Sequence, residues 1–220
     1  MRPQMQSKQT LKAVIAAAGV ALAALAAGGK ASAQEVEGCG NLRNAYGPKD
    51  YRTLNDNEKH LVEDAHFTEV VETLEKGQSG ASAGGDLDYT LRAIPNHPRA
   101  LLAMSRLGEK EKTQRPRGAN WVIDCYFQRA AAFRPDDENV HVLFGYHLLR
   151  KGDKAGAIRE LEKAQGLGAD TANVHYNLGL AYFDAGRMDD SLREAKKAYS
   201  MGFPLPGLRD KLKRTGAWND

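Results

Sequence analysis

Hydrophobic residues recur at helical spacing along much of the chain, and the pattern is clearest over residues 138–205. Within 172–205, one apolar stripe contains Leu178, Tyr182 and Phe183. Gly186 follows where a helix must stop and turn, a position that favours a residue tolerant of the left-handed conformation. A second stripe then contains Leu192, Ala195 and Ala198. This pattern predicts two amphipathic helices joined by a tight turn.

The same pattern occurs twice, at a spacing of 34 residues. The positions that are identical in the two copies are Asn139/Asn173, Val140/Val174, His141/His175, Gly145/Gly179, Gly152/Gly186, Arg159/Arg193, Glu160/Glu194, Lys163/Lys197, Ala164/Ala198 and Gly168/Gly202. A fixed period with two helical patterns inside it is typical of a helix–turn–helix solenoid. Neither helix pair can bury its apolar face alone, so we expect successive pairs to stack.

These residues resemble the tetratricopeptide repeat (TPR) family. The resemblance implies an all-α, TPR-type helix–turn–helix solenoid over about 64–205. It has about four units: a degenerate one over 64–97, one with an inserted internal loop over 98–137, and two strong ones over 138–171 and 172–205. Before the array, 34–63 is predicted to be mostly irregular. After it, 206–220 is predicted to form a capping helix and tail, because a solenoid needs a terminal element with a polar outer face.

The first 33 residues read as a secretory signal peptide. Arg2, Lys8 and Lys12 precede an apolar run over 13–27, and Ala31-Ser32-Ala33 supplies the small residues that a signal peptidase reads. A retained anchor helix is the alternative, but the apolar run is short for a bilayer span. We therefore expect cleavage after Ala33 and a periplasmic protein.

Cleavage changes the charge of the chain. The leader holds four of the 31 basic residues and no acid, which leaves 27 basic against 28 acidic residues. This balance does not favour nucleic acid as a partner. Contact with a membrane is likewise not expected.

Two cysteines, Cys39 and Cys125, remain in the mature chain. In an oxidising compartment they are expected to form a disulfide that fastens the N-terminal segment to a helix of the array. The alternative is a buried free Cys125 and an exposed Cys39.

Catalytic and metal-binding motifs are missing from the sequence. There is no nucleophile elbow, phosphate-cradling loop, HExxH pattern or Cys/His cluster with zinc spacing. His141 and His175 occupy equivalent repeat positions, so the period alone explains them. We expect no enzyme activity, no catalytic residue, no metal and no cofactor.

The TPR resemblance implies a groove lined by the first helix of each repeat. Val142 and Tyr176 occupy positions that are basic in TPR proteins that clamp a C-terminal carboxylate, so that mode is rejected. In the alternative view, the capping helix or the N-terminal segment covers part of the groove. The predicted groove residues are Asn139, Val142, Tyr146, Leu149, Arg150, Asn173, Tyr176, Leu180, Phe183 and Asp184.

Together these features predict a periplasmic protein–protein interaction module that presents its groove to a protein or peptide partner. The alternative is an accessory structural subunit of a cell-envelope assembly or secretion complex. Such a subunit would hold its partner through its outer surface and terminal helix.

Overall fold

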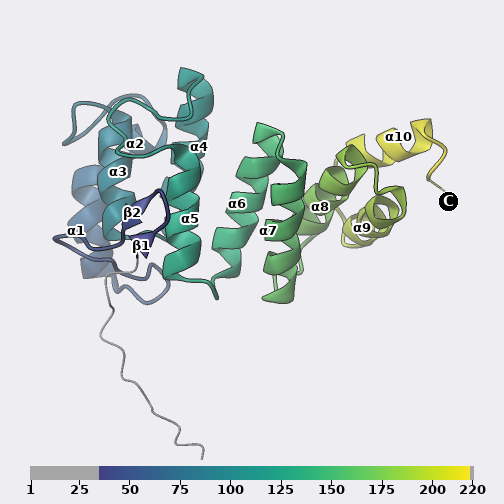
Figure 1. Ribbon diagram of the computed structural model, residues 1–220, viewed down its shortest axis with the longest axis horizontal. Coiled ribbons are helices and arrows are strands. Elements are labelled where there is room, and N and C mark those ends of the chain that lie inside the picture. Colours follow the sequence, from purple (N-terminus) through teal and green to yellow (C-terminus); the bar gives the residue numbers. More distant parts are fainter. Residues whose placement is uncertain (1–34, 219–220) are drawn as a thin grey trace, which may run out of the picture. The chain divides into compact units, whose positions relative to one another are not determined.

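The computed structural model describes residues 35–218, so the signal peptide predicted over 1–33 and its cleavage site lie outside the described residues. The described part is all-α apart from one short β-hairpin (Figure 1). Its elements are β1 (Glu35–Val36), β2 (Gly40–Asn41), α1 (Asp56–His66), α2 (Glu69–Glu72), α3 (Ala83–Ala93), α4 (Pro98–Glu111), α5 (Ile123–Phe133), α6 (Glu138–Lys151), α7 (Lys154–Gly166), α8 (Ala172–Asp184), α9 (Met188–Ser200) and α10 (Gly207–Arg214).

Consecutive helices pack in pairs, which confirms the predicted fold class. α6 packs on α7, α8 on α9, and α7 joins the two pairs by contacting α8. Gly145 shows why the pairs can close: a Cβ there would lie 2.5 Å from Leu161 Cγ, so a side chain would force α6 and α7 apart. Gly152 ends α6 with a φ of +87°, a conformation that L side chains rarely adopt.

α10 continues the repeat in register. Leu208 and Leu212 are fully buried and occupy the same repeat positions as Val174 and Leu178 of α8. α10 packs on both α8 and α9, as the first helix of a further repeat would. Its outer face is basic and includes Lys213 and Arg214, so the array ends in a helix with one apolar and one polar face.

The first half of the array departs from the regular period. The apolar stripe over 67–74 predicts a helix, yet only one turn forms there, Glu69–Glu72. The longer helix is α1, and its cap is Asn55, whose side chain accepts from the backbone of Glu58 in a capping box. Part of the segment 34–63 that was expected to be irregular is therefore helical.

The inserted loop of the second unit runs from the end of α4 to Ile123. Sequence pattern favours a helix from Asn120, but α5 begins three residues later. Before α5, the backbone N–H of Asn120 donates to the Asp88 carboxylate and to the Tyr126 hydroxyl, and its side-chain Nδ2 also donates to Asp88. These bonds hold the backbone of residue 120 in the loop.

The N-terminal segment is fastened to α5 by covalent and polar contacts. Cys39 and Cys125 form a disulfide with their Cα atoms 5.2 Å apart. Beside it, the buried Arg129 donates from Nη1 to the carbonyl oxygens of Cys39 and Asn41, at 2.9 and 2.7 Å. Its guanidinium also lies 4.1 Å from the ring centre of Trp121. Burial lowers the pKa of Arg129, so carbonyl oxygens and an aromatic face offset the desolvation of this cation.

Reduction of the disulfide is expected to destabilise the protein, because the bond closes a loop of 86 residues. A loss of about 2–4 kcal/mol in the free energy of unfolding is expected. Urea unfolding with and without reductant measures it. A Cys39→Ala, Cys125→Ala variant is the control and should not respond to reductant. Two titratable thiols in the native, unreduced protein would contradict the pairing.

Candidate functional site

The predicted groove residues lie on α6 and α8 and do not form one open surface. Asn139, Arg150, Asn173 and Asp184 are exposed, whereas the six apolar or aromatic members are half-buried. Val142 packs against Ala164, Ala169 and Val174, so it contributes to the contact between repeats. The structure therefore divides the set into a covered part and an open part.

The covered part is on α8 and corrects the expectation of a groove there. Tyr176 stacks on Phe203, with ring centres 4.0 Å apart. Leu180 and Phe183 pack against the cluster that contains Leu208 and Leu212 of α10. Lys211 of the same helix lies 3.3 Å from the Asp184 carboxylate. Phe203 and α10 therefore cover the apolar side chains of α8 that were predicted to line the groove.

The open part contains the exposed Asn139 and Asn173 and lies around the half-buried Tyr146, which is outside the cluster that contains α10 residues. Its ring packs beside the main core, and Leu149 of the same helix does so one turn later. Burial raises the pKa of the Tyr146 hydroxyl to about 12, and a hydrogen bond with the Asn177 side chain opposes that shift. Asn177 is fixed in turn, because its Nδ2 donates to the Asn173 carbonyl oxygen at 2.8 Å. We call Asn139, Tyr146, Leu149, Asn173 and Asn177 the α6–α8 surface.

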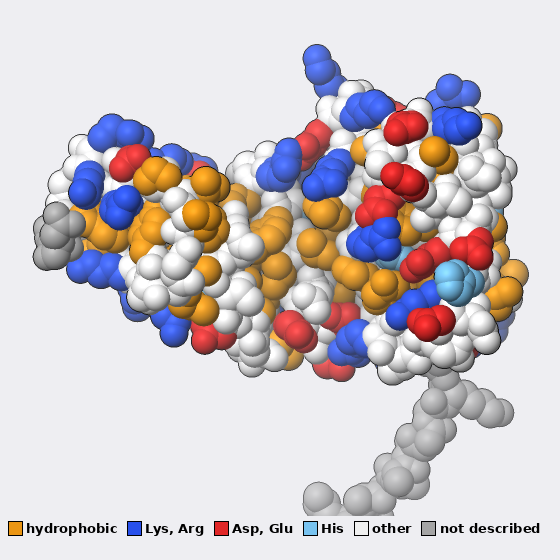
Figure 2. Space-filling view, turned by 180° about the vertical axis from the view of Figure 1, so that it is seen from behind, with side chains coloured by type: hydrophobic (Ala, Val, Ile, Leu, Met, Phe, Trp, Pro, Cys, Tyr) orange, Lys and Arg blue, Asp and Glu red, His pale blue; other side chains and the backbone are white. Residues whose placement is uncertain are grey.

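The α6–α8 surface combines an aromatic ring with uncharged polar groups. Arg150, at the end of α6, is held in an ion pair with Glu109 of α4. Figure 2 shows hydrophobic side chains gathered between the end that carries α10 and the N-terminal helices. An ordered, half-buried tyrosine among amides can offer contact area and hydrogen bonds to a peptide with little loss of conformational freedom.

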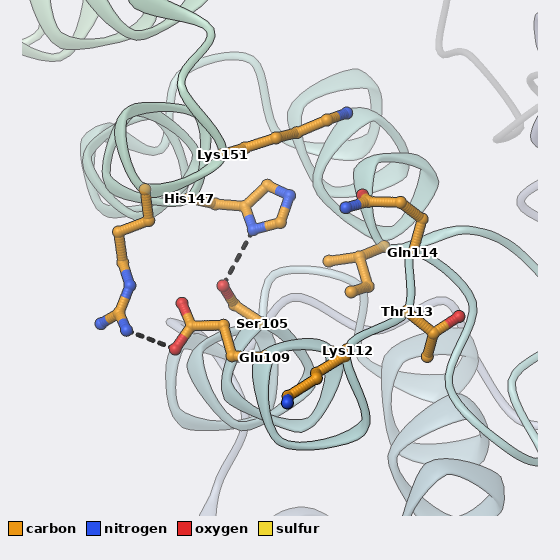
Figure 3. A pocket seen from close by; sticks show the side chains of 10 residues that line it. Ser105, Glu109, Lys112, Thr113, Gln114, His147 and Lys151 are labelled. Carbon is orange, nitrogen blue, oxygen red and sulfur yellow. Dashed lines mark hydrogen bonds and ion pairs between the residues drawn. The ribbon is translucent and has the colours of Figure 1, made fainter.

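A cavity of about 220 Å³ lies between α4, α6 and the inserted loop. Ser105 and His147 face each other inside it, while Glu109, Lys112 and Gln114 line the other sides (Figure 3). Ser105 Oγ lies 2.8 Å from His147 Nδ1, and His147 Nε2 lies 2.9 Å from Asp124 Oδ1. The carboxylate requires a donor, so Nε2 carries the proton and Nδ1 accepts from the serine hydroxyl.

This serine–histidine–aspartate chain has the order of a hydrolytic triad but not its surroundings. Ser105 lies in the interior of α4, where backbone N–H groups are used within the helix. The cavity also lies at the C-terminal ends of α4 and α6, which Lys112 and Lys151 mark. The C-terminal end of a helix carries a partial negative charge, and that charge would destabilise an oxyanion. The chain of hydrogen bonds instead joins α4, α5 and α6.

Sequence reasoning missed a second set of polar contacts, which recurs in both strong repeats. His141 Nδ1 lies 2.7 Å from Glu160, and His175 Nδ1 lies 2.7 Å from Glu194. Both histidines are buried, and each pair joins the two helices of its repeat. The signal was in the sequence, since the histidine and the glutamate recur together at the same spacing in both copies. Among residues 35–218, no cluster of three or more potential metal ligands is found.

None of the protein-family models matches the chain, and no curated protein matches it. Among solved structures, one titled "MamA MSR-1 C2" is similar over 70% of this chain and 80% of its own, at 18% sequence identity and a TM-score of 0.44. The helix pairs and the 34-residue spacing of this chain carry the fold assignment. Within the described residues, no helix is both long and apolar enough to cross a membrane.

Asp124 is expected to make the stability of the array depend on pH. Its hydrogen bond from His147, together with Lys151, lowers its pKa to about 2 against the opposing effect of burial. Because the pKa in the folded state is below the unfolded value, this stabilisation is present above about pH 4 and is lost as the pH falls through about 2. The loss amounts to about 2 kcal/mol.

Urea unfolding at about pH 5 and about pH 2 measures this effect. Asp124→Asn is the matched control, because it keeps the shape and removes the titration. The control should lose less stability than the wild type over that interval. Equal losses in both proteins would contradict this role of Asp124.

Proposed function

We propose that the protein is an exported interaction module that binds a segment of a partner protein on the α6–α8 surface. The observation that carries the proposal is Tyr146, a half-buried tyrosine held by Asn177 outside the cluster that α10 packs against. The TPR-type fold agrees with a protein partner. Apolar patches on monomeric proteins commonly mark contact sites, and tyrosine is prominent among residues that anchor them.

The partner segment is expected to be extended or helical and to bring apolar side chains to Tyr146 and Leu149. Its backbone can pair with the amides of Asn139 and Asn173, both of which are exposed. Because the open part of the surface presents amides and an aromatic ring, binding is expected to depend little on salt. Recognition of a helix or strand by a preformed groove is a common mode of peptide binding.

Tyr146→Ala is expected to weaken partner binding by about 2 kcal/mol or more, or roughly 30-fold. A photo-crosslinking residue at position 173 should capture a partner in cells, and Tyr146→Ala should abolish that product. A crosslinker at Arg159, an exposed residue of α7, is the positional control and should not give it.

Two variants separate binding from folding. Leu178→Ala removes a fully buried side chain and should cost roughly 2–5 kcal/mol of stability. Tyr176→Ala, which uncovers Phe203, should also lower the melting temperature. Tyr146→Ala should lower the melting temperature less than Leu178→Ala does, because the tyrosine ring is only half-buried. If it binds normally, or melts as early as Leu178→Ala, the α6–α8 surface is packing and the proposal fails.

The export part of the proposal rests on the basic leader, the apolar run and Ala31-Ser32-Ala33. Mass spectrometry of the protein isolated from cells should find a chain that begins at Gln34. Replacing Ala31 and Ala33 with bulky residues should block processing. An unmodified wild-type chain that begins at Met1 would contradict export with cleavage.

A further inference from the structure

A second surface lies at the end of the array, around α10. Over residues 196–214 the chain has six Lys or Arg and one Asp, whereas the rest of the chain after residue 33 has 21 basic and 27 acidic residues. Four of these bases form no ion pair with a carboxylate of the described residues: Lys196, Arg209, Lys213 and Arg214. We call these four, with Met201 and Leu205, the terminal basic surface.

Two apolar side chains of this surface are exposed. Leu205 is 58% exposed and Met201 is 39% exposed, and both belong to the short segment between α9 and α10. The backbone around Leu205 is ordered, because the Tyr199 hydroxyl donates to its carbonyl oxygen at 3.0 Å. Tyr199 Oη also accepts from the backbone N–H of Arg209. The segment is therefore held in place with its leucine turned outward.

The preceding repeat provides an internal comparison. Thr171 occupies the position equivalent to Leu205, and its side chain caps α8 by accepting from Val174. Pro206 precedes α10 without a side-chain cap, so Leu205 neither caps a helix nor fills a core. The basic residues of α10 correspond to His175, Asn177, Gly179 and Leu180 of α8. Stacking therefore requires neither the charge nor the exposed leucine.

Aromatic rings connect the charged and apolar parts. The Arg209 guanidinium lies 5.2 Å from the ring centre of Tyr199, and Lys196 Nζ lies 6.0 Å from that of Trp218. Tyr199 and Trp218 are themselves in edge contact, with centres 5.8 Å apart. Figure 2 shows basic side chains around hydrophobic ones at the end that carries α10. Unpaired cations, exposed aliphatic tips and aromatic rings thus share one end of the protein.

We propose that the terminal basic surface docks the protein on an anionic lipid bilayer. Leu205 and Met201 would enter the boundary between headgroups and acyl chains, while the bases remain among the phosphates. Aromatic rings favour this interfacial depth, and long basic side chains can keep their charge in water while their stems cover apolar surface. The exposed apolar tips favour a bilayer over an acidic protein segment, because charge alone would suffice for the latter. The balanced total charge of the chain concealed this feature.

The test is flotation with vesicles of equal parts phosphatidylglycerol and phosphatidylcholine, compared with vesicles of phosphatidylcholine alone. Binding is expected only to the anionic vesicles and should weaken at high salt. Lys213→Ala with Arg214→Ala should weaken vesicle binding about 30-fold. Each basic residue near an anionic surface raises the binding constant roughly fivefold. Leu205→Ser should weaken binding by roughly tenfold, the effect of withdrawing one aliphatic side chain.

Arg159→Ala with Lys163→Ala is the matched control. It removes the same charge from exposed positions of α7 and should bind as the wild type does. Equal binding by all variants would assign attachment to another part of the chain and overturn the proposal. If Lys213→Ala with Arg214→Ala weakens vesicle binding and Leu205→Ser does not, the insertion of Leu205 into the bilayer is overturned. Retention on immobilised polyglutamate without flotation would assign the surface to an acidic protein partner.

Discussion

The structure depends on the fact that no helix pair can bury its apolar stripe alone. One continuous core runs from Phe67 in the first unit to Tyr182 in the last. Gly145 marks how close the helices must come, because a methyl group there would collide with Leu161. A stacked array of this kind must also be closed at its end. α10 does this by burying Leu208 and Leu212 against the last pair, so the terminal helix belongs to the same packing scheme as the repeats.

Apolar stripes bring helices together, and buried polar pairs determine their register. A buried histidine or carboxylate without a partner is costly, so each pair is satisfied in one relative position of its two helices. His141 with Glu160 and His175 with Glu194 apply this constraint within the two strong repeats. His147 applies it between units, through Ser105 on α4 and Asp124 on α5. The Ser105–His147–Asp124 set of hydrogen bonds resembles a catalytic triad because of the same need for satisfied hydrogen bonds.

The sequence predicted the architecture best where the period was intact. In the two strong copies the turn glycine and the apolar stripes repeat at one spacing, so the helix pairs followed directly. The first two units were harder because their local signals compete. The stripe over 67–74 is apolar enough for a helix, but Asn55 and Glu58 cap an earlier one. Residue 120 was misplaced because its backbone is bonded to Asp88, a residue distant in sequence.

The predicted groove shows the same limit at the level of function. Each strong repeat was assigned groove residues from its repeat positions alone, and the repeat positions do not show what α10 contacts. That helix covers Tyr176 and Phe183 while Tyr146 lies outside its cluster, so the equivalence of the two repeats does not extend to their surfaces. Among the described residues, the outer face of α10 takes no part in that packing, since Lys213 and Arg214 are exposed. Residues there can vary without disturbing the stack, and in this chain they are basic and lie beside an exposed leucine. Capping and recognition are therefore separable on one helix: Leu208 and Leu212 serve the first, and Arg209, Lys213 and Arg214 are available for the second.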